Sequence, residues 1–247
     1  MKFRLWQSRR GNLVLGMGVI CLVSYAALLS TPAQAQTYIF GRSDLFSGSQ
    51  PSSIANADLN GDGKPDLIVT NNGLNTVSVF LGKPDGTFQP AVQYNTGKNP
   101  SAVVTGDFNK DGKLDLAVVN YADNTVSILL GNGDGTFQAH VDYTVGQGPL
   151  ALVAADFNGD GKLDLAAANS QGGSVSVLLG NGDGTFKAAS SHATVANAFG
   201  VTAGDFNGDG KLDLAVSVFG SVSQVSILFG NGDGSFQNPV NYDTAAG

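Results

Sequence analysis

The sequence predicts an all-β fold built from four repeated units, each a sheet of four short antiparallel strands. An eleven-residue stretch, Asp-Phe-Asn-Gly-Asp-Gly-Lys-Leu-Asp-Leu-Ala, occurs at 156–166 and 205–215, with close variants at 107–117 and 58–66. The first Asp of each copy lies at 58, 107, 156 and 205, so the period is 49 residues. Outside the first 35 residues no segment has a convincing helical period. A fixed period of this size indicates a repeat architecture, and a unit this small must stack on its neighbours to bury a core.

The order of elements is clearest in the second unit, where apolar runs alternate with turn residues. We predict strands over 100–108, 114–119, 125–130 and 137–145, with turns over 120–124 and 131–135. The second and third strands are apolar on both faces, as expected of sheets packed between neighbours, and the fourth is mixed, as expected at a rim. Four such strands in a unit of this length match a β-propeller blade. An open sandwich is the alternative, but it would not demand a strict period.

The stretch between the first two strands has the chemistry of a calcium loop. Oxygen-bearing side chains occupy positions 1, 3, 5 and 9, and a Gly at position 6 allows the tight curl that a short chelating loop needs. No Glu follows at position 12, so the loop differs from an EF-hand and the Asp at position 9 is expected to close the shell. A plain turn is the simpler alternative, but clustering three carboxylates without a cation is repulsive.

About four Ca²⁺ ions are therefore expected. The predicted ligands are the side chains of Asp58, Asn60, Asp62, Asp66, Asp107, Asn109, Asp111, Asp115, Asp156, Asn158, Asp160, Asp164, Asp205, Asn207, Asp209 and Asp213, and the main-chain carbonyls of Lys64, Lys113, Lys162 and Lys211.

These motifs give the chain a resemblance to a known family. The Asp-x-Asn-x-Asp-Gly-Lys-x-Asp-Leu loop, followed in phase by a run ending Leu-Leu-Gly-Asn-Gly-Asp-Gly-Thr-Phe, is similar to the FG-GAP/VCBS repeats of integrin-α-like β-propellers. The resemblance covers about residues 40–247. It implies that the calcium loop joins the first two strands of a blade, which agrees with the placement above. It also implies a seven-bladed ring, whereas four loops are present here.

The number of units raises the question of closure. Phe40 and Phe236 share one phase with Phe88, Phe137 and Phe186, so the chain holds four units and one surplus outer strand. We expect a partial, open propeller that lacks further repeats or associates with itself through its end blades. A closed four-bladed ring is the alternative.

The first 35 residues are typical of a signal peptide. Four basic residues precede an apolar run from Leu13 to Leu29, and Ala33-Gln34-Ala35 is a small-x-small cleavage site. We therefore expect a signal peptide over 1–35 and a repeat domain over 36–247, with units at about 50–98, 99–147, 148–196 and 197–247. The alternative is an uncleaved membrane anchor. Export to the periplasm, the cell surface or the extracellular space follows, with no membrane attachment after cleavage.

Composition narrows the possible partners. Removing the leader removes the only Cys, Cys21, and leaves 9 basic against 20 acidic residues, a formal net charge of −11. A nucleic-acid partner is not expected of so acidic a chain. Every acidic residue is Asp, and 12 of the 20 lie in the four loops, so the acidity reflects the predicted metal ligands.

The other candidate sites have simpler interpretations. The Gly-Asn-Gly-Asp-Gly segments at 131–135, 180–184 and 230–234 are interpreted as tight turns, since no Lys-Ser/Thr and no helix follow. His140 and His192 are interpreted as rim residues, because no partner group lies nearby in sequence. Strand parity places the Gly-Asn-Gly-Asp-Gly turns and the predicted calcium loops at the same end of the blades. The more variable turns, with Tyr121 and Phe219, lie at the other end, where binding is usual on a repeated scaffold.

The sequence therefore predicts an exported, calcium-binding module without catalytic activity, whose ligand is an unknown protein or glycan. Two alternatives remain open: a lectin-like carbohydrate binder, and a propeller fragment of a larger extracellular enzyme. No catalytic constellation was found to support the last.

Overall fold

The computed structural model describes residue 45 and residues 47–194, 197–219 and 223–244. All the described residues belong to one compact unit, Asp44–Gly247. The predicted signal peptide, Cys21 and Phe40 lie outside the described residues.

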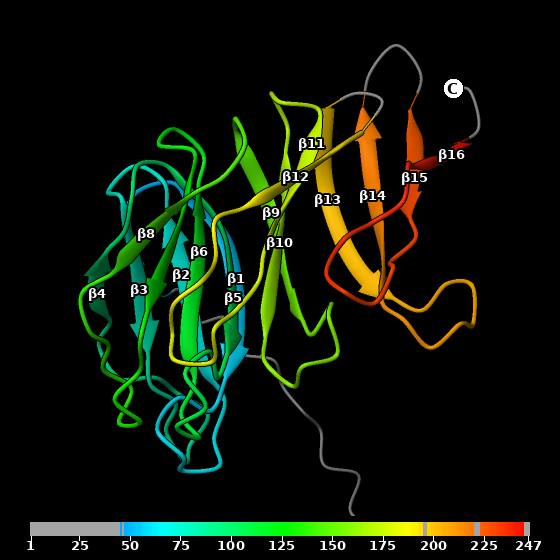
Figure 1. Ribbon diagram of the computed structural model, residues 1–247. Helices are drawn as coiled ribbons and strands as arrows, with labels where there is room; N and C mark the ends of the chain where they lie inside the picture. The colour runs from blue at the N-terminus through cyan, green and yellow to red at the C-terminus, as the bar shows by residue number, and fades with distance from the viewer. Residues whose placement is uncertain (1–44, 46, 195–196, 220–222, 245–247) are drawn as a thin grey trace, which may run out of the picture. The chain divides into compact units, whose positions relative to one another are not determined.

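The described residues form sixteen β-strands in four sheets (Figure 1). Every sheet is an antiparallel meander whose strands pair in chain order. The strands are β1 (Pro51–Ala57), β2 (Asp66–Asn71), β3 (Thr76–Phe80) and β4 (Val92–Asn95); β5 (Pro100–Gly106), β6 (Asp115–Asn120), β7 (Thr125–Leu129) and β8 (Val141–Thr144); β9 (Pro149–Ala155), β10 (Asp164–Asn169), β11 (Ser174–Leu178) and β12 (Ser190–Ala193); and β13 (Asn197–Gly204), β14 (Asp213–Phe219), β15 (Gln224–Leu228) and β16 (Val240–Asp243). The predicted all-β fold of four four-stranded units is confirmed. Among the described residues, no helix has the length and hydropathy of a membrane span.

Burial follows the position of each strand in its sheet. Every residue of β6 and of β10 is buried, and the third strands β3 and β11 are buried throughout. The fourth strands β4, β8 and β12 are mostly exposed. Strands that are apolar on both faces must be covered on both faces, so the middle strands of the inner sheets require a neighbouring sheet on each side.

The fourth strand of each unit is shorter than predicted. In the second unit the prediction began the strand at Phe137, but β8 covers only Val141–Thr144. Phe137 instead forms an isolated bridge with Gly131 and is buried. Its ring meets Tyr94 of the first sheet edge-on, with 5.3 Å between ring centroids. The prediction was wrong because the ring is used for packing between sheets, which strand propensity alone does not show.

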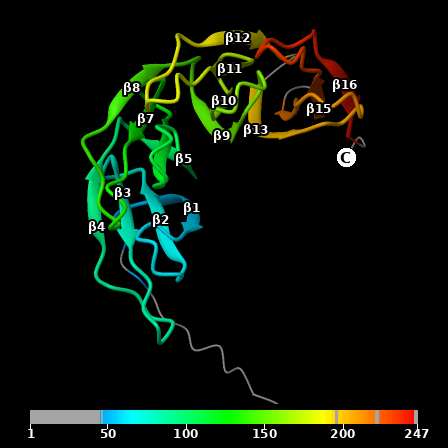
Figure 2. The same ribbon diagram turned by 60° about the horizontal axis from the view of Figure 1, so that its bottom comes forward.

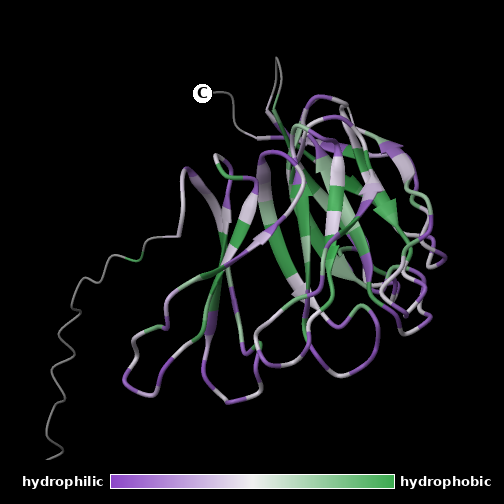
Figure 3. Ribbon diagram, turned by 90° about the vertical axis from the view of Figure 1, so that its left-hand side faces the viewer, coloured by the Kyte–Doolittle hydropathy of each residue, from purple (hydrophilic) through white to green (hydrophobic). Residues whose placement is uncertain are grey.

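The hydrophobic core lies between the sheets. The sheets stack in chain order, with β1 against β5, β5 against β9 and β9 against β13. Each of three core clusters takes side chains from two successive sheets, such as Val77 with Leu116, Ile128 with Leu165, and Val177 with Leu214. Figure 3 shows the apolar residues gathered along the middle of the strands. Stability is therefore shared between neighbours, as expected of repeat proteins.

The first and fourth sheets lie at opposite ends of this stack, which is an open series and not a ring (Figure 2). The fourth sheet differs accordingly. Along β14 and β15 buried residues are interspersed with partly or fully exposed ones, because among the described residues no further sheet covers one face of these strands. The predicted open arrangement of propeller-type blades is thus confirmed within this unit.

Candidate functional site

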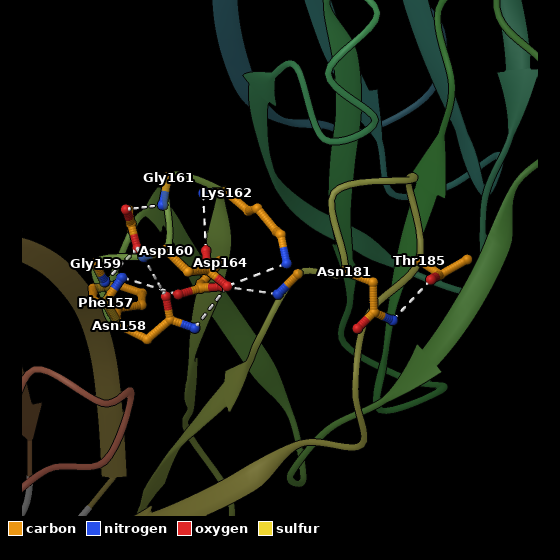
Figure 4. Close-up of polar contacts among 11 residues, drawn as sticks. Phe157, Asn158, Gly159, Asp160, Gly161, Lys162, Asp164, Asn181 and Thr185 are labelled. Atoms are coloured by element: carbon orange, nitrogen blue, oxygen red, sulfur yellow. Dashed lines mark hydrogen bonds and ion pairs between the residues drawn. The ribbon is translucent and has the colours of Figure 1, made fainter.

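Each predicted calcium loop connects the first and second strands of a sheet. The third loop lies between β9 and β10, and Figure 4 shows its side chains gathered around the curled backbone. The Gly-Asn-Gly-Asp-Gly turn of the same sheet lies beside it, since Gly180 N–H donates to the Asp164 carboxylate at 2.8 Å. The shared end that strand parity predicted for loops and turns is confirmed.

The first Asp of the loop organises the backbone around itself. The Asp156 Oδ1 atom accepts from the N–H groups of Gly159 and Asp160 at 2.7 and 3.2 Å, and its Oδ2 accepts from Gly161 at 2.7 Å. Asn158 Oδ1 accepts from Asp160 N–H at 3.0 Å. Gly161 has a φ of 76°, which a residue with a Cβ rarely adopts. The other three loops repeat the bonds to positions 5 and 6, so the predicted curl is confirmed.

In the first three loops the Asp at position 5 is paired with the Lys at position 7. The Lys64 ammonium lies 2.9 Å from the Asp62 carboxylate, and the Lys113 ammonium lies 3.6 Å from Asp111. The hydrogen bond from the Lys64 side chain lowers the pKa of Asp62, and the Lys113 backbone N–H lowers that of Asp111. These carboxylates are therefore ionised at neutral pH.

The Asp at position 9 has a role that the sequence did not reveal. Asp164 is fully buried, and its two oxygens accept from Phe157 N–H at 2.9 Å and Gly180 N–H at 2.8 Å. All four copies make both bonds. The carboxylate thus ties the loop, the second strand and the following turn together. The Gly that begins each turn was a sequence signal for this close approach between the turn and the loop. A Cβ at Gly180 would collide with the Leu163 carbonyl, so only Gly fits there.

The donor set fits a hard divalent cation, although the side chains do not converge on one point. Among the described residues, no three Asp, Glu, His or Cys side chains are grouped closely enough to hold a metal. Each loop nevertheless concentrates three carboxylates and one amide oxygen, the ligands that Ca²⁺ takes, and an ionised carboxylate has lone pairs beyond those used here. Burial raises the pKa of Asp115, and the neighbouring Asp111 and Asp107 raise it further. A bound dication would offset that repulsion.

The repeated loops match a known family. The model of the FG-GAP-like repeat matches residues 58–118, 107–167 and 156–216. The chain belongs to the FG-GAP-like repeat family. No curated protein matches the chain.

Solved structures share the fold of the FG-GAP-like repeats. The periplasmic gluconolactonase PpgL of Pseudomonas aeruginosa is 21% identical with a TM-score of 0.55, and covers 78% of this chain and 56% of its own. The streptogramin B lyase structure is 17% identical with a TM-score of 0.53, covering 81% and 56%. BBS1N in complex with ARL6DN is 12% identical with a TM-score of 0.58, covering 82% and 61%. The chain therefore spans less than two thirds of each of these structures, and the likeness concerns the propeller fold alone.

The turns of the FG-GAP-like repeats lock each blade to the preceding one. The Phe186 ring packs edge-on against Phe108 of the Asp-rich loop in the previous blade, with 5.7 Å between centroids, and Gly184 N–H donates to the Phe108 carbonyl at 3.1 Å. Phe236 and Gly234 repeat both contacts on Phe157, at 5.6 and 3.2 Å. The second and third loops are therefore held by their own blades through the buried Asp and by the next blade through this turn.

The two histidines of the repeats have different surroundings. His140 Nδ1 lies 2.9 Å from Asp142, which also accepts from Ser127 Oγ at 2.6 Å. A Ser-His-Asp relay places the His between the other two; here the fully buried Ser127 donates to the Asp, and its Oγ lies 3.5 Å from His140 Nδ1. His192 packs on the Phe236 ring at 5.4 Å, and burial lowers its pKa.

The two aromatic residues of the variable end are not brought together. Tyr121 follows β6, and its hydroxyl accepts from Gln171 Nε2 of the third sheet at 2.6 Å. Phe219 ends β14 in the fourth sheet, and its exposed ring meets Phe199 edge-on at 5.9 Å. The aromatic platform that a lectin-like site would need is therefore not formed by these two residues jointly.

Proposed function

We propose that this chain is an exported, calcium-stabilised module that binds a partner without catalysing a reaction. The observation that carries the proposal is the fourfold loop: the Asp at position 1 holds the same backbone curl in every blade, and each loop places three Asp and one Asn within nine residues. When bound, Ca²⁺ would supply positive charge to an acidic loop and bridge its oxygens.

The residues of each loop have distinct parts in this function. The Asp at positions 1 and 5 and the Asn at position 3 would offer the exposed oxygens. The buried Asp at position 9 connects those oxygens to the second strand and to the turn, so that cation binding and blade stability are coupled. Extracellular calcium modules typically have Kd values of about 10⁻⁴ to 10⁻³ M.

The mass-action gain is comparable with the lower end of the stability of a domain, which is roughly 5–15 kcal/mol. One site held at ten times its Kd contributes about 1.4 kcal/mol, and four independent sites would contribute about 5 kcal/mol. The melting temperature should therefore rise with calcium and fall with excess chelator.

Calorimetric titration tests the assignment. The chain should bind about four Ca²⁺, and Asp160→Asn should remove one site while leaving the others. Asp183→Asn is the matched control, because Asp183 is an exposed Asp of the same sheet whose carboxylate accepts only from Thr185 within its turn. Absence of calcium binding below about 10 mM, or equal losses in the two variants, would defeat the proposal.

A further inference from the structure

The contact between blades is repeated three times among the described residues and is incomplete in the first and the fourth of the described sheets. The residue at position 2 of the calcium loop is covered by the Phe of the next blade in the first three loops. Its exposed fraction is 3% for Leu59, 2% for Phe108 and 2% for Phe157, but 49% for Phe206 in the fourth loop. Phe157 and Phe206 lie in the same local sequence, yet the Phe157 ring is covered by the next blade and the Phe206 ring is exposed.

The outer strand repeats this pattern. Tyr94, Tyr143 and His192 each meet the Phe of the next blade edge-on, at 5.3, 5.5 and 5.4 Å. The corresponding residue of the fourth sheet is Tyr242, which is 55% exposed. The same side of the fourth sheet also carries Val225, Ile227 and Phe229, which are only partly buried. Their equivalents in the second and third sheets are buried or half-buried core residues. Together with Phe206 and Tyr242 they form the open face of the fourth sheet.

The first sheet presents the complementary part. Its turn ends Asp85-Gly86-Thr87-Phe88, and Thr87 donates to Asp85 through both N–H and Oγ1, as Thr136 and Thr185 do in the next two turns. Gly86 has a φ of 79°, close to the 83° and 85° of the corresponding glycines in those turns. The turn is therefore already in the conformation that docks on a preceding blade.

Nothing in the described chain receives this turn. A Cβ added at Gly135 or Gly184 would meet Leu81 or Leu130 of the preceding blade within 3 Å, whereas one added at Gly86 would meet no atom within 4 Å. Ile54 shows the same difference: it is 64% exposed, while its equivalents Val103 and Leu152 are 6% and 7% exposed against the preceding sheet.

We propose that the open face of the fourth sheet binds the first sheet of a second copy of this chain, with Phe88 packed on Phe206 and Tyr242, and Gly86 over Phe229. The contact continues the interface that already joins the four blades, so the occupant is a blade of the same repeat. Val69 and Phe80 of the first sheet are already buried, so they are not available for this contact. The second copy therefore contributes the turn that carries Phe88, together with the exposed Ile54. Two different surfaces meet, which makes the interface heterologous.

A heterologous interface can be tested by complementation. Phe206→Ser removes the receiving surface and Phe88→Ser removes the inserted ring, so each variant alone should lack self-association. An equimolar mixture should restore one interface and give a 1:1 dimer, because each copy keeps the surface that the other lacks. Val141→Ser is the control, since Val141 is 57% exposed on the outer strand of the second sheet, away from both ends.

Sedimentation analysis gives the mass in solution of each purified variant. The protein is used with whatever processing the producing cell has carried out. The mass of the wild-type chain and of the control should rise with concentration, and dissociation constants should rise at least tenfold in each end variant. Circular dichroism checks folding, and Tyr242→Ser replaces Phe206→Ser should that variant fail to fold. A wild-type chain that stays monomeric at its highest soluble concentration overturns the proposal, as does a mixture that stays monomeric or an association unchanged by both end variants.

Discussion

Phe108 and Phe206 offer a matched test of how the blades are stabilised. Both occupy position 2 of a calcium-type loop, and the N–H of each donates to the buried Asp of its own blade, at 2.9 and 3.0 Å. Replacement by Ala keeps that bond, so only the ring is lost. Phe108 is buried under the Phe186 ring of the next blade, whereas half of Phe206 is exposed.

The expected cost follows from burial. Deleting a fully buried Phe side chain costs about 3–5 kcal/mol, because a cavity remains where the ring packed. The half-exposed Phe206 leaves no enclosed cavity, and its removal should cost about 1 kcal/mol. Since domains are stable by roughly 5–15 kcal/mol in total, Phe108→Ala should remove a large share of the stability and Phe206→Ala a small one.

Urea unfolding followed by circular dichroism measures the difference, at saturating calcium and at a concentration low enough for the chain to be monomeric. The free energy of unfolding should fall about 2–4 kcal/mol further in Phe108→Ala than in Phe206→Ala. Equal losses in the two variants would refute the view that the next blade, and not the loop itself, stabilises this residue.

Three further predictions concern single positions. Asp164→Ala should cost about 2–5 kcal/mol even in excess chelator, because two buried backbone N–H groups lose their acceptor; a loss seen only with calcium present would show that the residue acts solely as a ligand. Burial lowers the pKa of His192, so the folded state stays neutral where the unfolded state gains a proton; its contribution to stability is present above about pH 6.5 and lost as pH falls from there toward the folded-state pKa. His192→Gln should flatten the decline in unfolding free energy between pH 7 and 5, and an unchanged slope would contradict this. Gly135→Ala should destabilise more than Gly86→Ala, since both have positive φ but only Gly135 packs on Leu81; equal melting temperatures would oppose the proposed packing.

Local chemistry was predictable from the sequence because it depends on neighbours along the chain. The 49-residue period required stacked units, and the alternation of apolar runs with Gly, Asn and Asp gave the four strands of each blade within a few residues. The curl of the calcium loop followed from the Gly at position 6, whose positive φ the structure confirms. Strand parity then placed loops and turns at one end.

What the sequence by itself did not determine are the contacts between residues in different strands and blades. The sequence predicted the Asp at position 9 as a metal ligand, and only the structure shows that its carboxylate also accepts from the N–H of the Gly that begins the turn after the third strand. Phe137 had the pattern of a strand residue, but its ring completes a core in the previous blade. Phe157 and Phe206 lie in identical eleven-residue stretches, yet one is covered and the other open. Burial depends on which blade follows in space, and only the tertiary structure decides that.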